Sequence, residues 1–112
     1  MNRYQTAGVM WLIAAALSAT ATVVFREDTT WFVITIVASA IAAVLGILLL
    51  LRPNRTTGLL SALGGIAWVT MYAVLIVIQS DDVQAWSADA VFLLVGAAAS
   101  LIGFSGGRQA AR

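Results

Sequence analysis

The sequence contains no cysteine, no histidine and no lysine, and it has a single proline. The absence of cysteine excludes disulfide bonds, thiolate metal sites and cysteine nucleophiles. The absence of histidine removes the commonest metal ligand and the usual general base. Charge is also scarce, because only 10% of the residues are charged, whereas soluble domains average about 25%. We therefore expect no enzyme, no metal site and no cofactor.

Apolar residues dominate the composition instead. They make up 62% of the 112 residues, and the mean hydropathy is +0.98. A membrane-spanning helix needs about 20 apolar residues, so four such helices with short connections use nearly all of this chain. We expect one transmembrane domain over residues 1–112, surrounded by the lipid bilayer, and no nucleic-acid partner. All six basic residues are arginine, which indicates a GC-rich bacterial genome.

The centre of the chain is the turn Arg52-Pro53-Asn54-Arg55. Proline cannot continue a helix, and it biases the residue before it away from helical geometry. Two uncharged stretches precede this turn and two follow it, so each half reads as one helical hairpin. The predicted transmembrane helices cover residues 4–25, 29–51, 56–80 and 87–107. The predicted fold class is an all-α integral membrane protein, with four transmembrane helices arranged as two helical hairpins in a compact bundle.

Two of these stretches allow a second interpretation. The first could be a signal peptide, with Ala19-Thr20-Ala21 as a small-residue cleavage site, but its length favours a retained helix. The fourth is the shortest, so its helix should either extend back toward Trp86 or thin the bilayer locally. Ser87 is the expected N-cap of that helix, with Asp89 in its first turn.

The basic residues are distributed unevenly about the four stretches. Five arginines lie on one side of the predicted spans, at the termini and the central turn: Arg3, Arg52, Arg55, Arg108 and Arg112. Arg26 lies on the other side, together with all five acidic residues. Cytoplasmic segments of membrane proteins carry the excess of basic residues. The sequence therefore predicts a multi-pass protein of the plasma (inner) membrane, with both termini and the Arg52–Arg55 turn in the cytoplasm.

Small and weakly polar residues recur at steps of three and four in every predicted helix. Close approach through such residues holds membrane helices together, because burying leucine away from lipid gains little. We therefore expect four seams that line the interior of a tight bundle. The seams are Gly8, Trp11, Ala15, Ser18 and Thr22; Thr35, Ser39, Ala42 and Gly46; Thr57, Ser61, Gly64 and Trp68, beside Tyr72; and Gly96, Ser100, Gly103 and Gly107.

The acidic residues all fall in the two loops predicted to face outward. They are Glu27, Asp28, Asp81, Asp82 and Asp89. They could bind a cation weakly at the surface, but solvated loop charges are the simpler interpretation. On this assignment no ionisable side chain lies within the helices, which argues against a transporter that couples to protons or binds charge.

Trp68 and Tyr72 form the one candidate site, because they lie four residues apart with Gly64 and Gly65 one turn away. Trp11 can approach the same layer from the first helix. Glycines beside aromatic rings can form a pocket for an apolar or aromatic ligand, with the indole and phenol as polar anchors. Alternatively, these rings fill the core and hydrogen-bond to Ser, Thr or a backbone carbonyl of a neighbouring helix.

Three functions from different classes fit this sequence. The first is a non-catalytic membrane protein that is an accessory or scaffolding subunit of a larger membrane complex, or that forms a homo-oligomer. The second is a small transporter or binder of an apolar or aromatic molecule, and a pore made by several copies is a third. Size and span number are similar to those of the small multidrug resistance transporters. That family carries a membrane-embedded glutamate in its first helix, and the first predicted helix here contains no acid, so the chain is not assigned to it.

Overall fold

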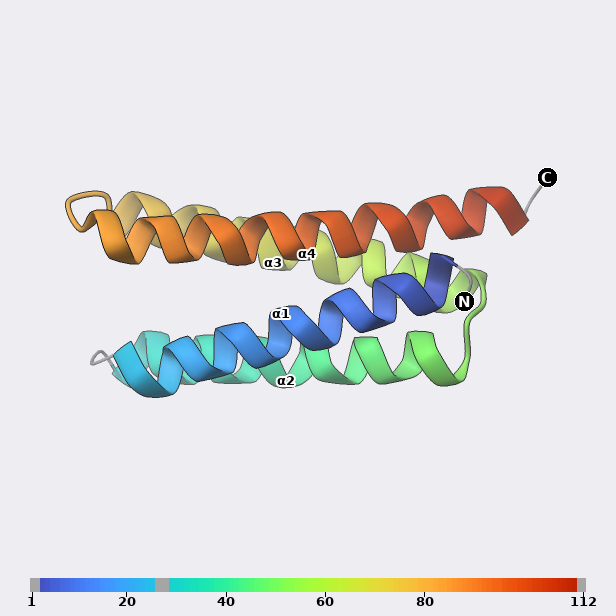
Figure 1. The fold of residues 1–112 in the computed structure, drawn as a ribbon, viewed down its shortest axis with the longest axis horizontal. Coiled ribbons are helices and arrows are strands. Elements are labelled where there is room, and N and C mark those ends of the chain that lie inside the picture. Colours follow the sequence, from blue (N-terminus) through green and yellow to red (C-terminus); the bar gives the residue numbers. More distant parts are fainter. Residues whose placement is uncertain (1–2, 26–28, 111–112) are drawn as a thin grey trace.

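The computed structural model describes residues 3–25 and 29–110, apart from the side chains of residues 25, 85 and 106–110. Four helices make up most of this part of the chain: α1 (Arg3–Phe25), α2 (Thr29–Leu51), α3 (Arg55–Ile78) and α4 (Val83–Ala110). They lie side by side in an elongated bundle of 46 × 20 × 19 Å (Figure 1). Each helix is long and apolar enough to cross a membrane. The predicted all-helical class and the four-helix bundle are confirmed.

The central turn has the predicted form. Helix α2 ends at Leu51 and α3 begins at Arg55, so Pro53 lies between them. The Asn54 side chain accepts the Thr57 N–H at 3.0 Å, and the Asn54 N–H donates to Thr57 Oγ1 at 3.1 Å. This reciprocal capping box satisfies two amide groups that the first turn of a helix otherwise leaves unbonded.

Helix α4 begins earlier than the sequence indicated. It starts at Val83, so the expected extension toward Trp86 is present and continues almost one turn further. The Asp82 carboxylate accepts the Gln84 N–H at 3.1 Å. Asp82 therefore caps this helix, and the prediction that Ser87 does so was wrong. As a consequence, Asp89 lies in the second turn of a helix and not at the edge of a loop.

The helices are packed unequally. Helix α3 lies along α4 and α1 lies along α2, while α1 also contacts α4. Helices α2 and α3 touch each other least of these pairs, although one short turn joins them. Figure 1 shows α1 lying obliquely, with its start near α4 and its end near α2. Helix α1 therefore packs against both α2 of its own hairpin and α4 of the other hairpin.

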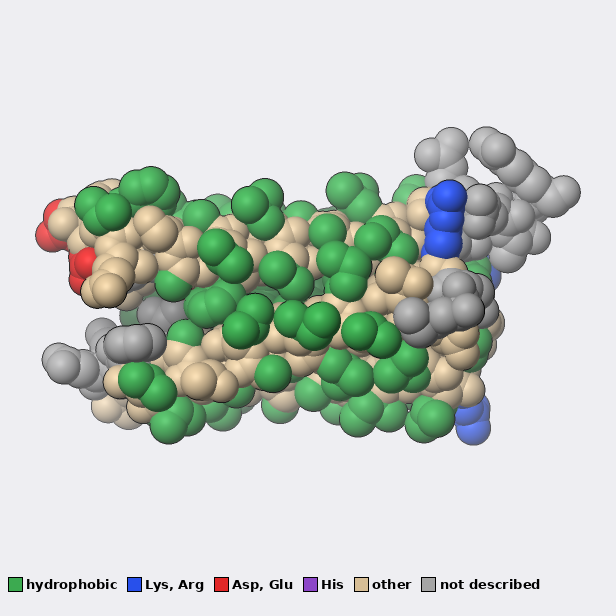
Figure 2. Space-filling model, in the orientation of Figure 1, with side chains coloured by type: hydrophobic (Ala, Val, Ile, Leu, Met, Phe, Trp, Pro, Cys, Tyr) green, Lys and Arg blue, Asp and Glu red, His purple; other side chains and the backbone are tan. Residues whose placement is uncertain are grey.

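Basic and acidic side chains gather at opposite ends of the bundle (Figure 2). The end with the α2–α3 turn, which we call the arginine end, carries Arg3, Arg52 and Arg55, all exposed. The other end, which we call the acidic end, carries the exposed Asp81 and Asp82. Several residues of the predicted charge pattern lie outside the described part of the chain: Arg26, Glu27, Asp28, Arg112 and the side chain of Arg108.

The predicted seams face the interior of the bundle. Every seam residue of α1 and α2 is buried, as are most of those in α3 and α4. Gly8 and Gly46 bring α1 and α2 into backbone contact, because a Cβ atom on either would lie 2.7 Å from the carbonyl oxygen of the other. In α3, Gly65 lies against α4, because a Cβ atom there would overlap Ser100. Gly64 is only half-buried and faces α2.

Candidate functional site in the bundle core

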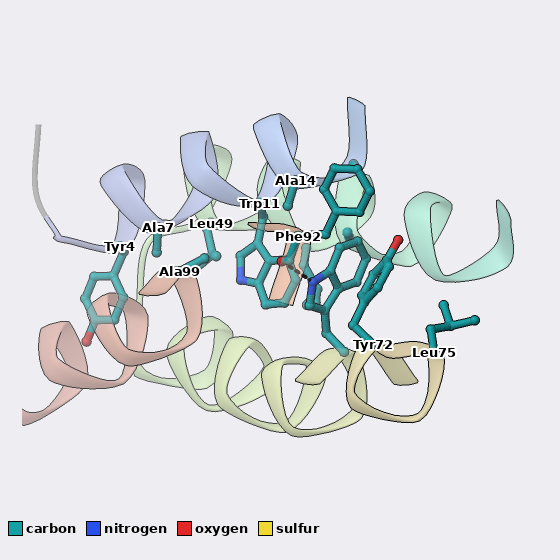
Figure 3. Packing of buried hydrophobic residues seen from close by; sticks show 13 residues of the cluster. Tyr4, Ala7, Trp11, Ala14, Leu49, Tyr72, Leu75, Phe92 and Ala99 are labelled. Carbon is teal, nitrogen blue, oxygen red and sulfur yellow. Dashed lines mark hydrogen bonds between the residues drawn. The ribbon is translucent and has the colours of Figure 1, made fainter. Parts of the chain in front are cut away.

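The aromatic residues singled out in the sequence come together in the core. The ring centroids of Trp11 and Trp68 are 5.7 Å apart at an interplanar angle of 87°, an edge-to-face arrangement. Trp68 and Tyr72 are 5.1 Å apart, and Tyr72 is 5.5 Å from Phe92 of α4. These contacts join the four rings into one contiguous layer, of which Figure 3 labels Trp11, Tyr72 and Phe92. We call Trp11, Trp68, Tyr72 and Phe92 the aromatic layer.

The polar atoms of these rings are bonded within the chain. The Trp11 Nε1–H donates to Ser61 Oγ at 2.7 Å, and the Trp68 Nε1–H donates to the Phe92 carbonyl oxygen at 2.8 Å. The Tyr72 hydroxyl bonds to Ser18 Oγ. The two indoles and the phenol thus each have a hydrogen-bond partner on another helix. This geometry is that of the second interpretation of these rings, in which they fill the core.

The glycines beside the rings serve close helix packing. A Cβ atom on Gly64 would lie 2.6 Å from Leu45 Cδ1 of α2, and one on Gly65 would overlap Ser100. A Cβ atom on Gly96 would overlap the Trp68 indole. The space left by each missing side chain is therefore occupied by a neighbouring helix. Phe92 was not identified from the sequence as a member of this site, although it lies four residues before Gly96 in the fourth seam.

Toward the acidic end, buried hydroxyl groups from three helices bond to one another. The Thr22 hydroxyl donates to Thr35 Oγ1 at 2.9 Å, and the Ser39 hydroxyl donates to Ser18 Oγ at 3.0 Å. The Tyr72 hydroxyl extends this set from α2 and α1 to α3 through Ser18. All five side chains are at least 96% buried. We call Ser18, Thr22, Thr35, Ser39 and Tyr72 the hydroxyl cluster.

Asp89 also lies in the interior, contrary to the sequence interpretation. Its side chain is only 2% exposed, and it falls within the apolar stretch Trp86–Ser105 of α4. The predictions that Asp89 is a solvated loop acid and that the helices contain no ionisable side chain were therefore wrong. The error arose because a charged residue was used to mark the end of an apolar stretch. The signal that could have corrected it is the spacing of Asp89 three residues before Phe92 and seven before Gly96.

The chemistry available in the core is that of hydrogen bonding. Its described polar side chains are mostly hydroxyls and indoles, with Asp89 as a carboxyl group. Hydroxyls donate one hydrogen and accept through two lone pairs, and an ionised carboxyl group only accepts. Neither histidine nor lysine exists in the chain to act as a base.

No family model, no curated protein and no solved structure matches this chain.

Proposed function

We propose that this chain is a multi-pass protein of a bacterial plasma (inner) membrane, with both termini and the Arg52–Arg55 turn in the cytoplasm. Four helices of sufficient length and apolarity support the insertion. Large apolar side chains also face outward along the bundle, among them Val37, Ile41 and Val44 of α2, where lipid can cover them. The separation of the arginine end from the acidic end supports the orientation, because basic residues accumulate on the cytoplasmic side.

Within that membrane, we propose a non-catalytic role as an accessory or scaffolding subunit of a larger complex, or as a homo-oligomer. The observation that carries this proposal is the filled core. The rings of the aromatic layer pack on one another, their polar atoms bond to neighbouring helices, and the glycines beside them are occupied by other helices. Recognition would then use the outer faces of the bundle, where small apolar contacts and lipid-exposed side chains can meet a second membrane protein.

A second candidate function is transport or binding of an apolar or aromatic molecule at Trp11, Gly64, Gly65, Trp68 and Tyr72. The contiguous aromatic layer favours it, because four rings from three helices contact one another in series. A ligand would have to displace contacts that the rings make with each other. Trp68→Ala and Tyr72→Ala variants should lose binding of such a molecule, and unchanged binding in both would refute this site.

The test of the main proposal is native mass spectrometry of the C-terminally tagged protein after gentle detergent extraction from its source membrane. The accessory role predicts larger membrane proteins that co-purify in fixed proportion, and the homo-oligomer predicts a single multiple of the chain mass. A monomer that carries a bound small molecule would instead support the function of transporting or binding an apolar or aromatic molecule. Turnover or transport by the purified protein alone would overturn the non-catalytic role.

The orientation has a separate test, which the absence of cysteine makes clean. Thr56 is exposed at the arginine end and Ser80 is exposed at the acidic end, so each can be replaced by the only cysteine in the chain. A membrane-impermeant maleimide added to intact cells should label Ser80→Cys and spare Thr56→Cys until the cells are opened. The reverse pattern would refute the proposed orientation.

A further inference from the structure

The Tyr4 hydroxyl is buried at the arginine end of the bundle and has no hydrogen-bond partner in the described part of the chain. The side chain is only 6% exposed. The hydroxyl of the other tyrosine, Tyr72, bonds to Ser18, as is usual for a buried phenol. A buried polar group is costly to leave unbonded, so the Tyr4 hydroxyl points to a ligand that this structure does not contain.

The Tyr4 ring packs between α1, α3 and α4. A Cβ atom on Gly58 would lie 2.8 Å from Tyr4 Cε1 and 2.9 Å from the Gly103 carbonyl oxygen. The side chains of a helix lean toward its N-terminus, and the N-terminus of α1 is at the arginine end (Figure 1). In Figure 3 the hydroxyl accordingly lies on the side of the ring away from Ala7 and Trp11. It is therefore aimed toward the arginine end.

Exposed arginines border this region on α1 and α3. Arg3 precedes Tyr4 and reaches α4, where its guanidinium donates to Ser105 Oγ at 3.0 Å. Arg55 lies three residues before Gly58, and therefore on the same face of α3 and one turn nearer the end of the bundle. Both arginine side chains are exposed. The Tyr4 hydroxyl thus points to a region that receives positive charge from two helices.

The first turn of α3 adds backbone donors to the same region. The capping box of Asn54 and Thr57 bonds the N–H of the third helical residue. It leaves the N–H groups of Arg55 and Thr56 without a partner inside the helix. Such groups and the helix dipole favour an anion at a helix N-terminus. All acidic side chains of the described residues lie toward the acidic end, so none of these carboxylates competes for the donors.

We propose that Tyr4, Arg3, Arg55 and the first turn of α3 form a site for the phosphate group of an acidic phospholipid. A phosphate carries negative charge and several acceptor oxygens, which suit guanidinium groups, helix N–H groups and a phenol donor together. The ends of membrane-spanning helices lie at the level of the lipid headgroups, so a lipid presents its phosphate at this height. The site rests on the proposed membrane insertion, but not on the partner or the oligomeric state.

Binding requires a movement at the edge of the site. The Tyr4 hydroxyl is covered in this structure, so a phosphate oxygen reaches it only after a neighbouring side chain moves. Arg3 and Arg55 are exposed and have long flexible stems, so they can change rotamer and follow the phosphate. The bound phosphate then links α1 to α3 at the arginine end, and we expect it to stabilise the fold.

The test is thermal unfolding of the purified, delipidated full-length protein in mild detergent. The added lipid is phosphatidylglycerol, which is acidic, or phosphatidylcholine with the same acyl chains, which has no net charge. A ligand that binds only the folded state raises Tm with its concentration. We expect phosphatidylglycerol to raise Tm and phosphatidylcholine to leave it nearly unchanged. Sodium phosphate is compared with sodium chloride at matched ionic strength, and a rise with sodium phosphate as large as that with phosphatidylglycerol would assign the site to free phosphate and overturn the lipid proposal.

Tyr4→Phe is the decisive variant, because it removes the hydroxyl without changing the charge or the ring beside Gly58. In delipidated detergent it should melt no lower than the native protein, since no hydrogen bond within the described chain is lost. Its affinity for phosphatidylglycerol should fall about tenfold, because a hydrogen bond to a charged group is lost. Tyr72→Phe is the matched control, which should lower Tm by losing the bond to Ser18 but keep the full response to the lipid.

Two charge variants separate a defined site from general attraction to acidic lipid. Arg55→Gln and Arg52→Gln each remove one positive charge at the arginine end, but only Arg55 shares a face of α3 with Gly58. We expect Arg55→Gln to weaken the response to phosphatidylglycerol more than Arg52→Gln does. Equal effects of the two variants would assign the response to overall charge and overturn the site.

Two further outcomes overturn the proposal. The first is a Tyr4→Phe variant that binds phosphatidylglycerol as tightly as the native protein. The second is a Tyr4→Phe variant that melts lower in delipidated detergent, because the hydroxyl then bonds within the protein. Either result would refute the lipid site alone, since maleimide labelling in cells tests membrane insertion and orientation independently.

Discussion

Gly96→Ala tests whether the packing of α4 against α3 requires the absence of a side chain at position 96. The added Cβ atom would overlap the Trp68 indole, which must then move. That movement breaks the 2.8 Å bond from Trp68 Nε1–H to the Phe92 carbonyl oxygen and disturbs the edge contact with Trp11. Overpacking a core costs about 1–3 kcal/mol, and a lost hydrogen bond costs about 1 kcal/mol. Alanine returns about 1 kcal/mol through its higher helix propensity. We expect a net loss of about 2 kcal/mol in the free energy of unfolding.

Gly64→Ala is the matched control, because it gains the same helix propensity within the same hairpin. Its Cβ atom would meet only Leu45 Cδ1, the end of a flexible side chain. We expect this variant to lie within about 1 kcal/mol of the native protein. Steric trapping measures both in mild detergent, since it reports unfolding without relying on tryptophan fluorescence. Equal stability of the two variants, or a more stable Gly96→Ala, would refute the packing argument.

Two further predictions concern the other contacts of the core. Gly46→Val should separate α1 from α2 and cost about 3 kcal/mol or more, because its Cβ atom would lie 2.7 Å from the Gly8 carbonyl oxygen and backbone cannot yield as a side chain does; an unchanged unfolding midpoint would contradict this. Tyr72→Phe should cost about 1 kcal/mol by removing the bond to Ser18. Combining it with Ser18→Ala in a double-mutant cycle should show a coupling energy of about 0.5–1 kcal/mol, and strict additivity would show that the two hydroxyls do not interact energetically.

The sequence predicted the helices and their inner faces well, because those depend on local patterns. The bounds of α2 are as expected, and Pro53 marks the central turn. The seams were identified because small residues recur at helical spacing, and their burial follows from that spacing. Trp11, Trp68 and Tyr72 were placed together for the same reason.

The remaining features depend on contacts between helices, which the spacing of residues within a single helix cannot reveal. Gly64 and Gly65 are adjacent, and only the rotation of α3 decides that Gly65 meets α4 while Gly64 meets α2. The acceptor of the Trp68 indole is a backbone carbonyl on α4, which no residue type encodes. Asp89 was assigned to a loop because carboxylates in a sequence are typical of loops. Its burial becomes visible only when the packing of the helices is known.

The unequal helix contacts have a consequence for the order in which this chain is made. The side-chain hydroxyls of the first hairpin can bond to one another as soon as it is synthesised, because Thr22 bonds to Thr35 and Ser39 bonds to Ser18 within it. The third helix has little to gain from α2, the neighbour that precedes it. The Trp68 indole must wait for the Phe92 carbonyl oxygen, which the ribosome adds 24 residues later. The nascent protein therefore passes through a stage in which the first hairpin is complete and α3 can bond only to α1, through Ser61 and Tyr72. Aggregation would compete with folding until α4 is made.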